Sequence, residues 1–212
     1  MRKGFTLIEL MIVIAIIAII AAIAIPNLLE SRITSNESAA AASLKSGLFP
    51  GQVGFASGCY IDEDGDNRGE FGHLSHLNGT NKTWGSITIN ANLTFLGTEY
   101  STGNVTTGGV ANPDVTTGGI SGYFFSSVLA DAGTTSTTAG YREKYWAACA
   151  YPEQFDDTGR RSFVISQEGK VLTAPPDNTL IDTATILGKA YNSAAEAVTP
   201  SNRTPLWQPY AK

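Results

Sequence analysis

The 212-residue sequence predicts an α+β fold in which a long N-terminal helix precedes a set of antiparallel strands. Residues 5–25 form an apolar run that is interrupted only by Thr6 and Glu9, and residues 26–51 continue it with amphipathic, helical spacing. Later segments alternate apolar and polar residues, and residues 161–173 form a hairpin pattern around a glycine. One helical segment followed by neighbouring strands is typical of the α+β class.

The first half of the helix has the length and composition of a membrane span. Its 21 residues would extend about 31 Å as a helix, which matches the hydrocarbon core of a bilayer. Arg2 and Lys3 precede it and should stay cytoplasmic, which places the rest of the chain outside. A carboxylate such as Glu9 is costly in lipid and therefore indicates a functional role. A signal peptide cleaved after Ala24 and a plain uncleaved anchor stay open as alternatives.

A specific motif stands at this end of the chain. Residues 4–10 read Gly-Phe-Thr-Leu-Ile-Glu-Leu behind the basic stub, and they resemble the prepilin signal of type IV pilins and type II secretion pseudopilins. The resemblance implies cleavage after Gly4 by a prepilin peptidase, N-methylation of Phe5, and pairing of Glu9 with the new Phe5 amine of a neighbouring subunit. Opposite charges that are each costly in a low dielectric would together fix the register of the subunits. Residues 1–4 are then a leader, and residues 5–25 the membrane span and filament core.

The second half of the helix begins at Pro26, which removes one backbone hydrogen bond and bends a helix. The resemblance also implies a proline at this place, where the helix can kink in the filament. Pro50-Gly51 predicts the end of the helix. The apolar stripe between them should lie against a globular domain of residues 52–212, and it consists of Leu28, Leu29, Ile33, Ala39–Ala42, Leu44 and Leu48. The resemblance implies that this long helix packs on a C-terminal antiparallel β-sheet.

The globular domain is predicted to be rich in strands and long loops. Central strands are expected at residues 122–129 and 143–150, and a hairpin at residues 161–166 and 170–173. In the second central strand, Tyr145, Ala147 and Cys149 share one face, and Trp146 and Ala148 share the other. Further expectations are one or two short strands in residues 84–96, a Gly/Thr-rich excursion at residues 97–122 and a short helix near residues 183–197.

An acidic segment resembles the first half of a calcium-binding loop. Asp62, Asp64 and Asp66 alternate, with Glu70 four residues further on, and oxygen ligands at this spacing suit a hard cation. The segment departs from that pattern, since Asn67 replaces the glycine and His73 replaces the final acid. Calcium binding and a solvated acidic turn therefore both stay open. A pair such as His73 and His76 is more typical of ordinary surface than of a metal site.

The two cysteines, Cys59 and Cys149, favour one disulfide in an exported chain. Such a bridge would stabilise the fold by roughly 4–5 kcal/mol in the chain-entropy model. Two buried thiols are the alternative.

The charge and the motif content exclude several function classes. The formal net charge is −5 and falls to −7 if Arg2 and Lys3 leave with the leader, which disfavours nucleic acid as a partner. The sequence contains no Ser/His/Asp set, G-x-S-x-G, H-E-x-x-H or phosphate loop, so we expect no enzyme. Calcium is the only candidate cofactor.

We therefore expect a structural subunit that polymerises through its N-terminal helix into an extracellular filament. The resemblance implies three kinds of partner: further copies of the chain, a prepilin peptidase/methyltransferase, and an inner-membrane assembly machinery. The chain would lie in the inner membrane before assembly and on the cell surface afterwards. Two alternatives remain, a pseudopilin of a type II secretion system and a minor tip pilin that acts as an adhesin.

Overall fold

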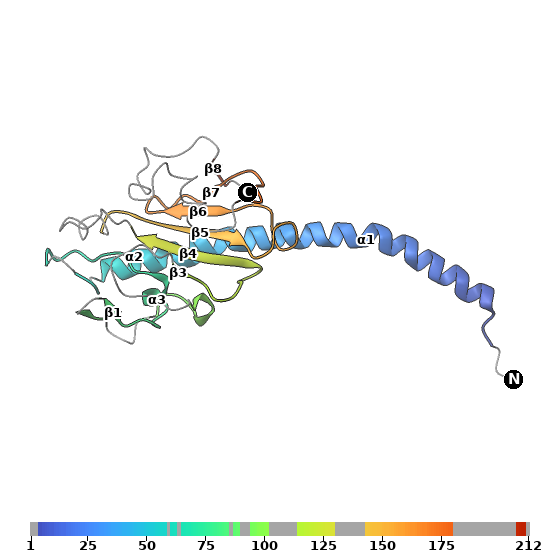
Figure 1. The fold of residues 1–212 in the computed structure, drawn as a ribbon, viewed down its shortest axis with the longest axis horizontal. Helices are drawn as coiled ribbons and strands as arrows, with labels where there is room; N and C mark the ends of the chain where they lie inside the picture. The colour runs from blue at the N-terminus through green and yellow to red at the C-terminus, as the bar shows by residue number, and fades with distance from the viewer. Residues whose placement is uncertain are drawn as a thin grey trace.

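The computed structural model describes residues 4–58, 60–62, 65–84, 87–89, 94–101, 114–129, 143–179 and 207–210. One long helix and a six-stranded antiparallel sheet form the described part, which confirms the predicted α+β architecture. The sheet and its loops build a compact part, here called the head, and the helix crosses the head and projects from it as a curved stalk (Figure 1). The stalk is defined as residues 5–32, because Ile33 is the first residue of the helix that is buried.

The helix begins at Leu7 because Thr6 caps it. α1 spans Leu7–Ala42, and it continues through a π-helix, η1 (Ser43–Leu48), into α2 (Phe49–Ser57). The predicted stop at Pro50-Gly51 is therefore wrong. A proline ring clashes with the carbonyl four residues earlier in a regular α-helix. Just before Pro50 the hydrogen bonds shift by one residue, with the Phe49 amide donating to Leu44 O, and this wider turn makes room for the ring.

The apolar stripe of the helix lies against the head as predicted, but it starts later than expected. Buried helix residues begin at Ile33 and continue with Ala40, Ala41, Leu44 and Leu48. Leu28 and Leu29, which the sequence placed in the same stripe, are 70% and 47% exposed. These two leucines belong to the stalk, and they extend its apolar surface past Pro26.

The main sheet has the strand order β3-β4-β5-β6-β7-β8, and every neighbouring pair is antiparallel. The strands are β3 (Asp114–Val115), β4 (Tyr123–Leu129), β5 (Trp146–Pro152), β6 (Phe163–Ser166), β7 (Leu172–Thr173) and β8 (Gln208–Pro209). The long central pair β4 and β5 and the β6–β7 hairpin confirm the predictions for residues 122–173. Gly169 takes the left-handed conformation in the hairpin turn, at φ 67°.

The smaller elements surround the end of the long helix. They are α3 (Leu74–Leu77), the short antiparallel pair β1 (Thr83–Trp84) and β2 (Ile87–Thr88), and the 3₁₀ turn η2 (Thr98–Tyr100). The strands expected in residues 84–96 thus exist as a separate two-stranded ladder, while Phe95 packs on Phe55 with ring centroids 6.1 Å apart. The helix expected near residues 183–197 lies outside the described residues.

The sheet buries side chains on both of its faces. Trp146, Ala148 and Ala150 point towards the helix and join the larger core, where Trp146 contacts the rings of Phe49 and Phe71. Ala147 and Cys149 point away from the helix into a second cluster. The predicted alternation of β5 is therefore confirmed.

Candidate functional site

The stalk exposes an apolar surface that no described part of the same chain covers. Phe5 is 84% exposed, and the large apolar side chains that follow are all exposed, at Leu7, Ile8, Leu10, Met11, Ile12, Val13, Ile14, Ile16, Ile17, Ile19, Ile20, Ile23, Ile25, Leu28 and Leu29. Keeping these 16 side chains in water instead of an apolar environment costs on the order of 30 kcal/mol. That exceeds the stability of a typical domain, about 5–15 kcal/mol. An exposed apolar surface of this size favours a cover of lipid or of other protein chains.

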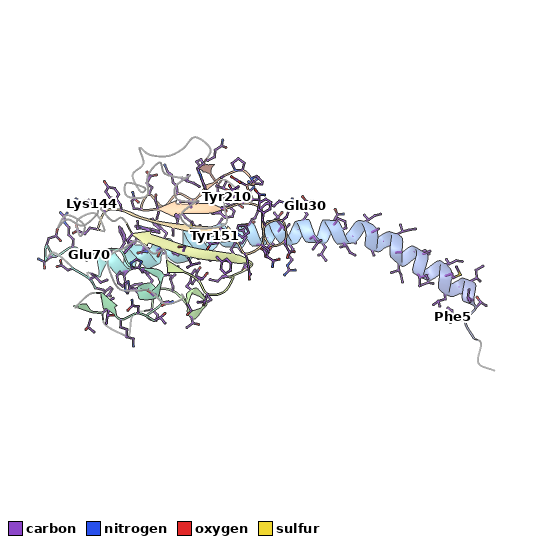
Figure 2. All side chains as sticks on the ribbon, viewed as in Figure 1. Phe5, Glu30, Glu70, Lys144, Tyr151 and Tyr210 are labelled. Atoms are coloured by element: carbon purple, nitrogen blue, oxygen red, sulfur yellow. The ribbon has the colours of Figure 1, made fainter. Side chains whose placement is uncertain are left out.

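The helix that carries this surface is also the one candidate membrane span in the described part of the chain. By length and composition alone, the continuous helix Leu7–Ser57 is apolar enough near its N-terminus to cross a bilayer. Phe5 lies at the tip of the stalk, far from the head (Figure 2). The proposed processing residues Gly4 and Phe5 are exposed there, and nothing lies within 4 Å of the Gly4 Cβ position.

Glu9 has a defined place at the start of the helix. Its Oε2 atom accepts hydrogen bonds from the Thr6 amide at 2.8 Å and from the Thr6 hydroxyl at 2.6 Å. The Glu9 amide donates to Thr6 Oγ1 in return, at 3.3 Å, which completes a capping box. No described residue donates a hydrogen bond to Glu9 Oε1. The carboxylate is thus held in one orientation, and one of its oxygens can accept a further donor.

Pro26 lies inside α1 and does not break it. Its missing N–H leaves the Ala22 carbonyl without the regular helical bond, which makes this the weakest point of the exposed stalk. Figure 1 shows α1 curving along its exposed half.

A clamp, which the sequence did not predict, joins the stalk to the head just beyond Pro26. The Arg160 side chain contacts Asp156 Oδ1 at 2.6 Å and Glu30 Oε1 at 3.5 Å. The Arg160 amide donates to Glu37 Oε1 at 3.1 Å, and Asn36 Nδ2 donates to the carbonyl of Thr158 at 2.9 Å. The hydrogen bond and the charge of Asp156 chiefly raise the pKa of the guanidinium. The β5–β6 loop therefore fixes the direction in which the helix leaves the head.

The acidic loop, which was predicted as a candidate calcium site, is partly described. Both carboxylate oxygens of Asp62 accept backbone amides, from Gly65 at 2.7 Å and from Asn67 at 3.1 Å. Asp66 faces the cation Arg68 at 3.8 Å. Glu70 is fully buried, at the end of the head far from the stalk (Figure 2). Asp64 lies outside the described residues, among which no group of three or more His, Cys, Asp or Glu side chains could hold a metal. The calcium site stays a prediction.

Of the two histidines next to this loop, His76 is buried and His73 is half-buried. His76 is 3% exposed, its ring stacks on Phe55, and its Nδ1 atom accepts the amide of His73 at 3.2 Å. The expectation of ordinary surface histidines is therefore wrong for His76. Its capping role at α3 and its apolar ring account for its burial.

The predicted disulfide also stays a prediction, because Cys59 lies outside the described residues. Cys149 is buried in β5 on the sheet face that points away from the helix. Tyr60, the next residue in the sequence after Cys59, packs on Phe55 in the helix-side core.

The chain thus combines an exposed apolar stalk, a capped Glu9 at the tip of the stalk and an antiparallel head. This combination is typical of proteins that attach to a membrane or to other subunits through an N-terminal helix. The known family model that matches the chain is the prokaryotic N-terminal methylation motif, over residues 1–25. No solved structure is significantly similar to the chain.

Three proteins of known identity resemble the chain. The type IV major pilin protein PilA of Myxococcus xanthus is 54% identical over 56 residues, 26% of this chain and 25% of that protein. The type IV wide pilus major component PilA4 of Thermus thermophilus is 64% identical over 42 residues, 20% of this chain and 32% of that protein. These two matches thus cover about a quarter and a third of the relatives.

The third relative extends the similarity over most of the chain. The type IV major alpha-pilin of Moraxella bovis is 30% identical over 166 residues, which is 74% of this chain and 96% of that protein. The chain therefore belongs to the type IV pilin family, and the resemblance seen in residues 4–10 is confirmed.

Proposed function

We propose that the chain is a structural subunit of a type IV pilus-like filament and that it assembles through its N-terminal helix. The observation that carries this proposal is the stalk, whose large apolar side chains are all exposed, while the described part of the head has a buried core of its own. Lipid covers that surface before assembly, and the stalks of other copies cover it afterwards. Relatives that are named as major pilins or as a major pilus component support the same role.

The first step is processing at the tip of the stalk. A prepilin peptidase removes residues 1–4 on the cytoplasmic side, and the new amine of Phe5 is methylated. The exposure of Gly4 and Phe5 supports this step, because an enzyme must reach the peptide bond between them. An inner-membrane assembly machinery then moves the subunit from the bilayer into the filament on the cell surface.

The second step is docking of one subunit on the next. Glu9 of one copy accepts the Phe5 amine of a neighbour, and Thr6 of its own chain holds the carboxylate in place. An uncompensated charge is costly in the apolar core of the filament, so the pair forms only when the two helices have the correct offset. Glu9 thereby sets the register of the filament, whereas the aliphatic side chains supply its cohesion.

The role is structural and not enzymatic. Arg160, Glu30 and Asp156 hold the clamp at the neck of the stalk, and Asp62 holds backbone amides of its own loop. The similarity to major pilins favours a filament subunit over a scarce tip adhesin or a secretion pseudopilin.

The test is mass spectrometry of the chain purified from sheared surface filaments. The proposal expects an abundant protein whose first residue is methylated Phe5. A chain that starts at Met1, or after Ala24, would show a different processing route. A chain that is absent from sheared filaments but required for protein secretion would identify a pseudopilin instead.

A further inference from the structure

A polar groove runs along the helix at the neck of the stalk. Its volume is about 540 Å³, and it is lined by Asn27, Glu30, Ser31, Thr34, Ser35 and Ser38. Asn27, Ser31, Thr34 and Ser38 recur at spacings of four, three and four residues, so they form one face of the helix. Asn27 follows Glu9 by 18 residues, or five full turns, which puts the groove on the same face as the proposed docking carboxylate.

The oxygen atoms and the negative charge around this shallow groove favour a positively charged hydrogen-bond donor. The Thr34 hydroxyl donates to Glu30 O at 2.9 Å, so what it offers to the groove is an oxygen acceptor. Glu30 lies at the rim, where the helix leaves the head (Figure 2). Together with Arg160 and Asp156, to which it is linked, Glu30 forms a trio with one net negative charge. Glu37, which accepts the Arg160 amide, adds a second negative charge nearby.

Arg32 is the matching group on the other side of the same helix. It is exposed and makes no ion pair or hydrogen bond with any residue that the structure describes. By helical geometry it points about 140° away from the direction of Thr34 and Ser38, so in its own chain it leaves that side of the groove open. A guanidinium carries five donors and no acceptor, which suits a site lined by oxygen atoms with a carboxylate at its rim.

We propose that the groove at the neck receives Arg32 of a second copy of the chain, as a polar contact above the apolar filament core. This proposal rests on the proposed function, because pairing Glu9 with Phe5 of a neighbour offsets the two parallel helices by four residues, about 6 Å. Arg32 of that neighbour then lies level with Asn36. Helical side chains lean towards the N-terminus, which lowers its guanidinium to the level of Ser31 and Ser35, inside the groove.

The contact between the groove and Arg32 repeats from one subunit to the next and does not form a closed ring. Each copy presents its groove to one neighbour and its Arg32 to another, and such a heterologous contact generates an open helical filament. The apolar stalks alone could slide past one another, since aliphatic surfaces have no directional partner. The groove and Arg32 therefore add a second fixed point of register, about 35 Å from Glu9 along the helix.

Charge reversal with rescue tests the proposal in cells that assemble the filament. Arg32→Glu should lower the amount of sheared filament protein by at least five- to tenfold, while the membrane pool keeps its processed, methylated Phe5. Adding Glu30→Arg to that variant restores an opposite-charge pair and should recover filaments to within about threefold of the parent. Thr34→Val should give a smaller loss. Lys170→Glu, the same change of charge in an exposed turn of the head, serves as the control.

Three outcomes would overturn the contact. Parental filament yield from Arg32→Glu would show that no neighbour uses its charge. A double variant with the same filament yield as Arg32→Glu alone would show that Glu30 pairs only with Arg160 of its own chain. In either case processed Phe5 in filaments would leave the proposed function standing. A change in the membrane pool or in processing, with the assembly of the remaining protein unaltered, would place the effect of Arg32 before assembly.

Thiol cross-linking gives an independent measure that leaves Arg32 in place. Leu29 lies one turn below Arg32 on the same side, and with the four-residue offset Leu29 of a neighbour falls level with Ile33, beside Thr34. Leu29→Cys combined with Thr34→Cys should yield a ladder of covalent multimers when filaments are treated with a short bis-maleimide. Each single variant controls for Cys59 and Cys149. A double variant without a ladder, or a product containing a different protein, would refute a second copy as the occupant.

Discussion

Glu9 has two roles, in the capping box with Thr6 and in the proposed ion pair with the Phe5 amine of a neighbour. Comparing Glu9→Ala with Thr6→Ala separates them. The capping box with Thr6 rests on contacts of 2.8 and 3.3 Å, and losing an N-cap side chain costs typically about 1 kcal/mol. Removing one partner of a buried ion pair costs about 3–5 kcal/mol, because it leaves the other charge without compensation. Glu9→Ala loses the ion pair and the half of the capping box that its side chain makes, whereas Thr6→Ala loses only the N-cap bond.

The two variants should therefore differ strongly in assembly. Since each 1.4 kcal/mol is a factor of ten, Thr6→Ala should lower filament yield about fivefold and Glu9→Ala by at least a hundredfold. Glu9→Gln keeps an oxygen for the Thr6 amide but loses the charge, so its filament yield should be close to that of Glu9→Ala. The assay compares sheared filament protein with the membrane pool on immunoblots, and the thermal unfolding of the head in detergent serves as the control for folding.

The reasoning would be refuted by equal losses in Thr6→Ala and Glu9→Ala. In that case the carboxylate would act only as a helix cap, and the register of the filament would have to come from elsewhere. Unfolding of the head in either variant would also contradict the structure, because both residues lie at the tip of an exposed stalk.

The remaining predictions concern the head. Burial and nearby Glu37 raise the pKa of Tyr123, and burial raises the pKa of Tyr100. The stability that these tyrosines contribute is therefore complete below pH about 10 and is lost as the pH rises further. Urea titrations should give a lower free energy of unfolding at pH 11 than at pH 8, and Tyr123→Phe should reduce this difference. Gly169→Ala should destabilise by about 1–2 kcal/mol in a thermal melt, because φ is 67° and the added Cβ would lie 2.8 Å from the Phe49 ring; an unchanged melting temperature would contradict the described turn. Trp146→Ala, at a fully buried site, should cost roughly 3–5 kcal/mol by the same assay, and a loss below 1 kcal/mol would mean that the helix does not pack there.

The sequence predicted the long helix and the central strands because their signals are local. Apolar spacing marks the helix, and Gly169 marks the hairpin turn. The helix end was mispredicted because Pro50 breaks an α-helix but is tolerated after a π turn. The local sequence does not show whether the helix ends at Pro50 or continues through a π turn, because the π turn also depends on packing against the head.

The edge strands and the neck clamp could not be predicted, because they depend on contacts between distant segments. β8 pairs with β7 through only two residues, Gln208 and Pro209, and no alternation can be seen in so short a strand. Trp207, buried beside that strand, was a usable signal, since a large aromatic residue in a polar tail indicates docking. Arg160 reaches Glu30 across 130 positions of sequence, and a doublet of arginines in a loop gives no indication of that partner.

The most direct test of the account is the structure of the native filament determined by cryo-electron microscopy. The account predicts that the methylated amine of Phe5 lies within about 4 Å of a Glu9 carboxylate oxygen of a neighbouring subunit, a separation at which opposite charges form an ion pair. A map in which every Glu9 contacts only its own Thr6, or in which the stalks are splayed apart and the heads alone hold the filament together, would contradict it.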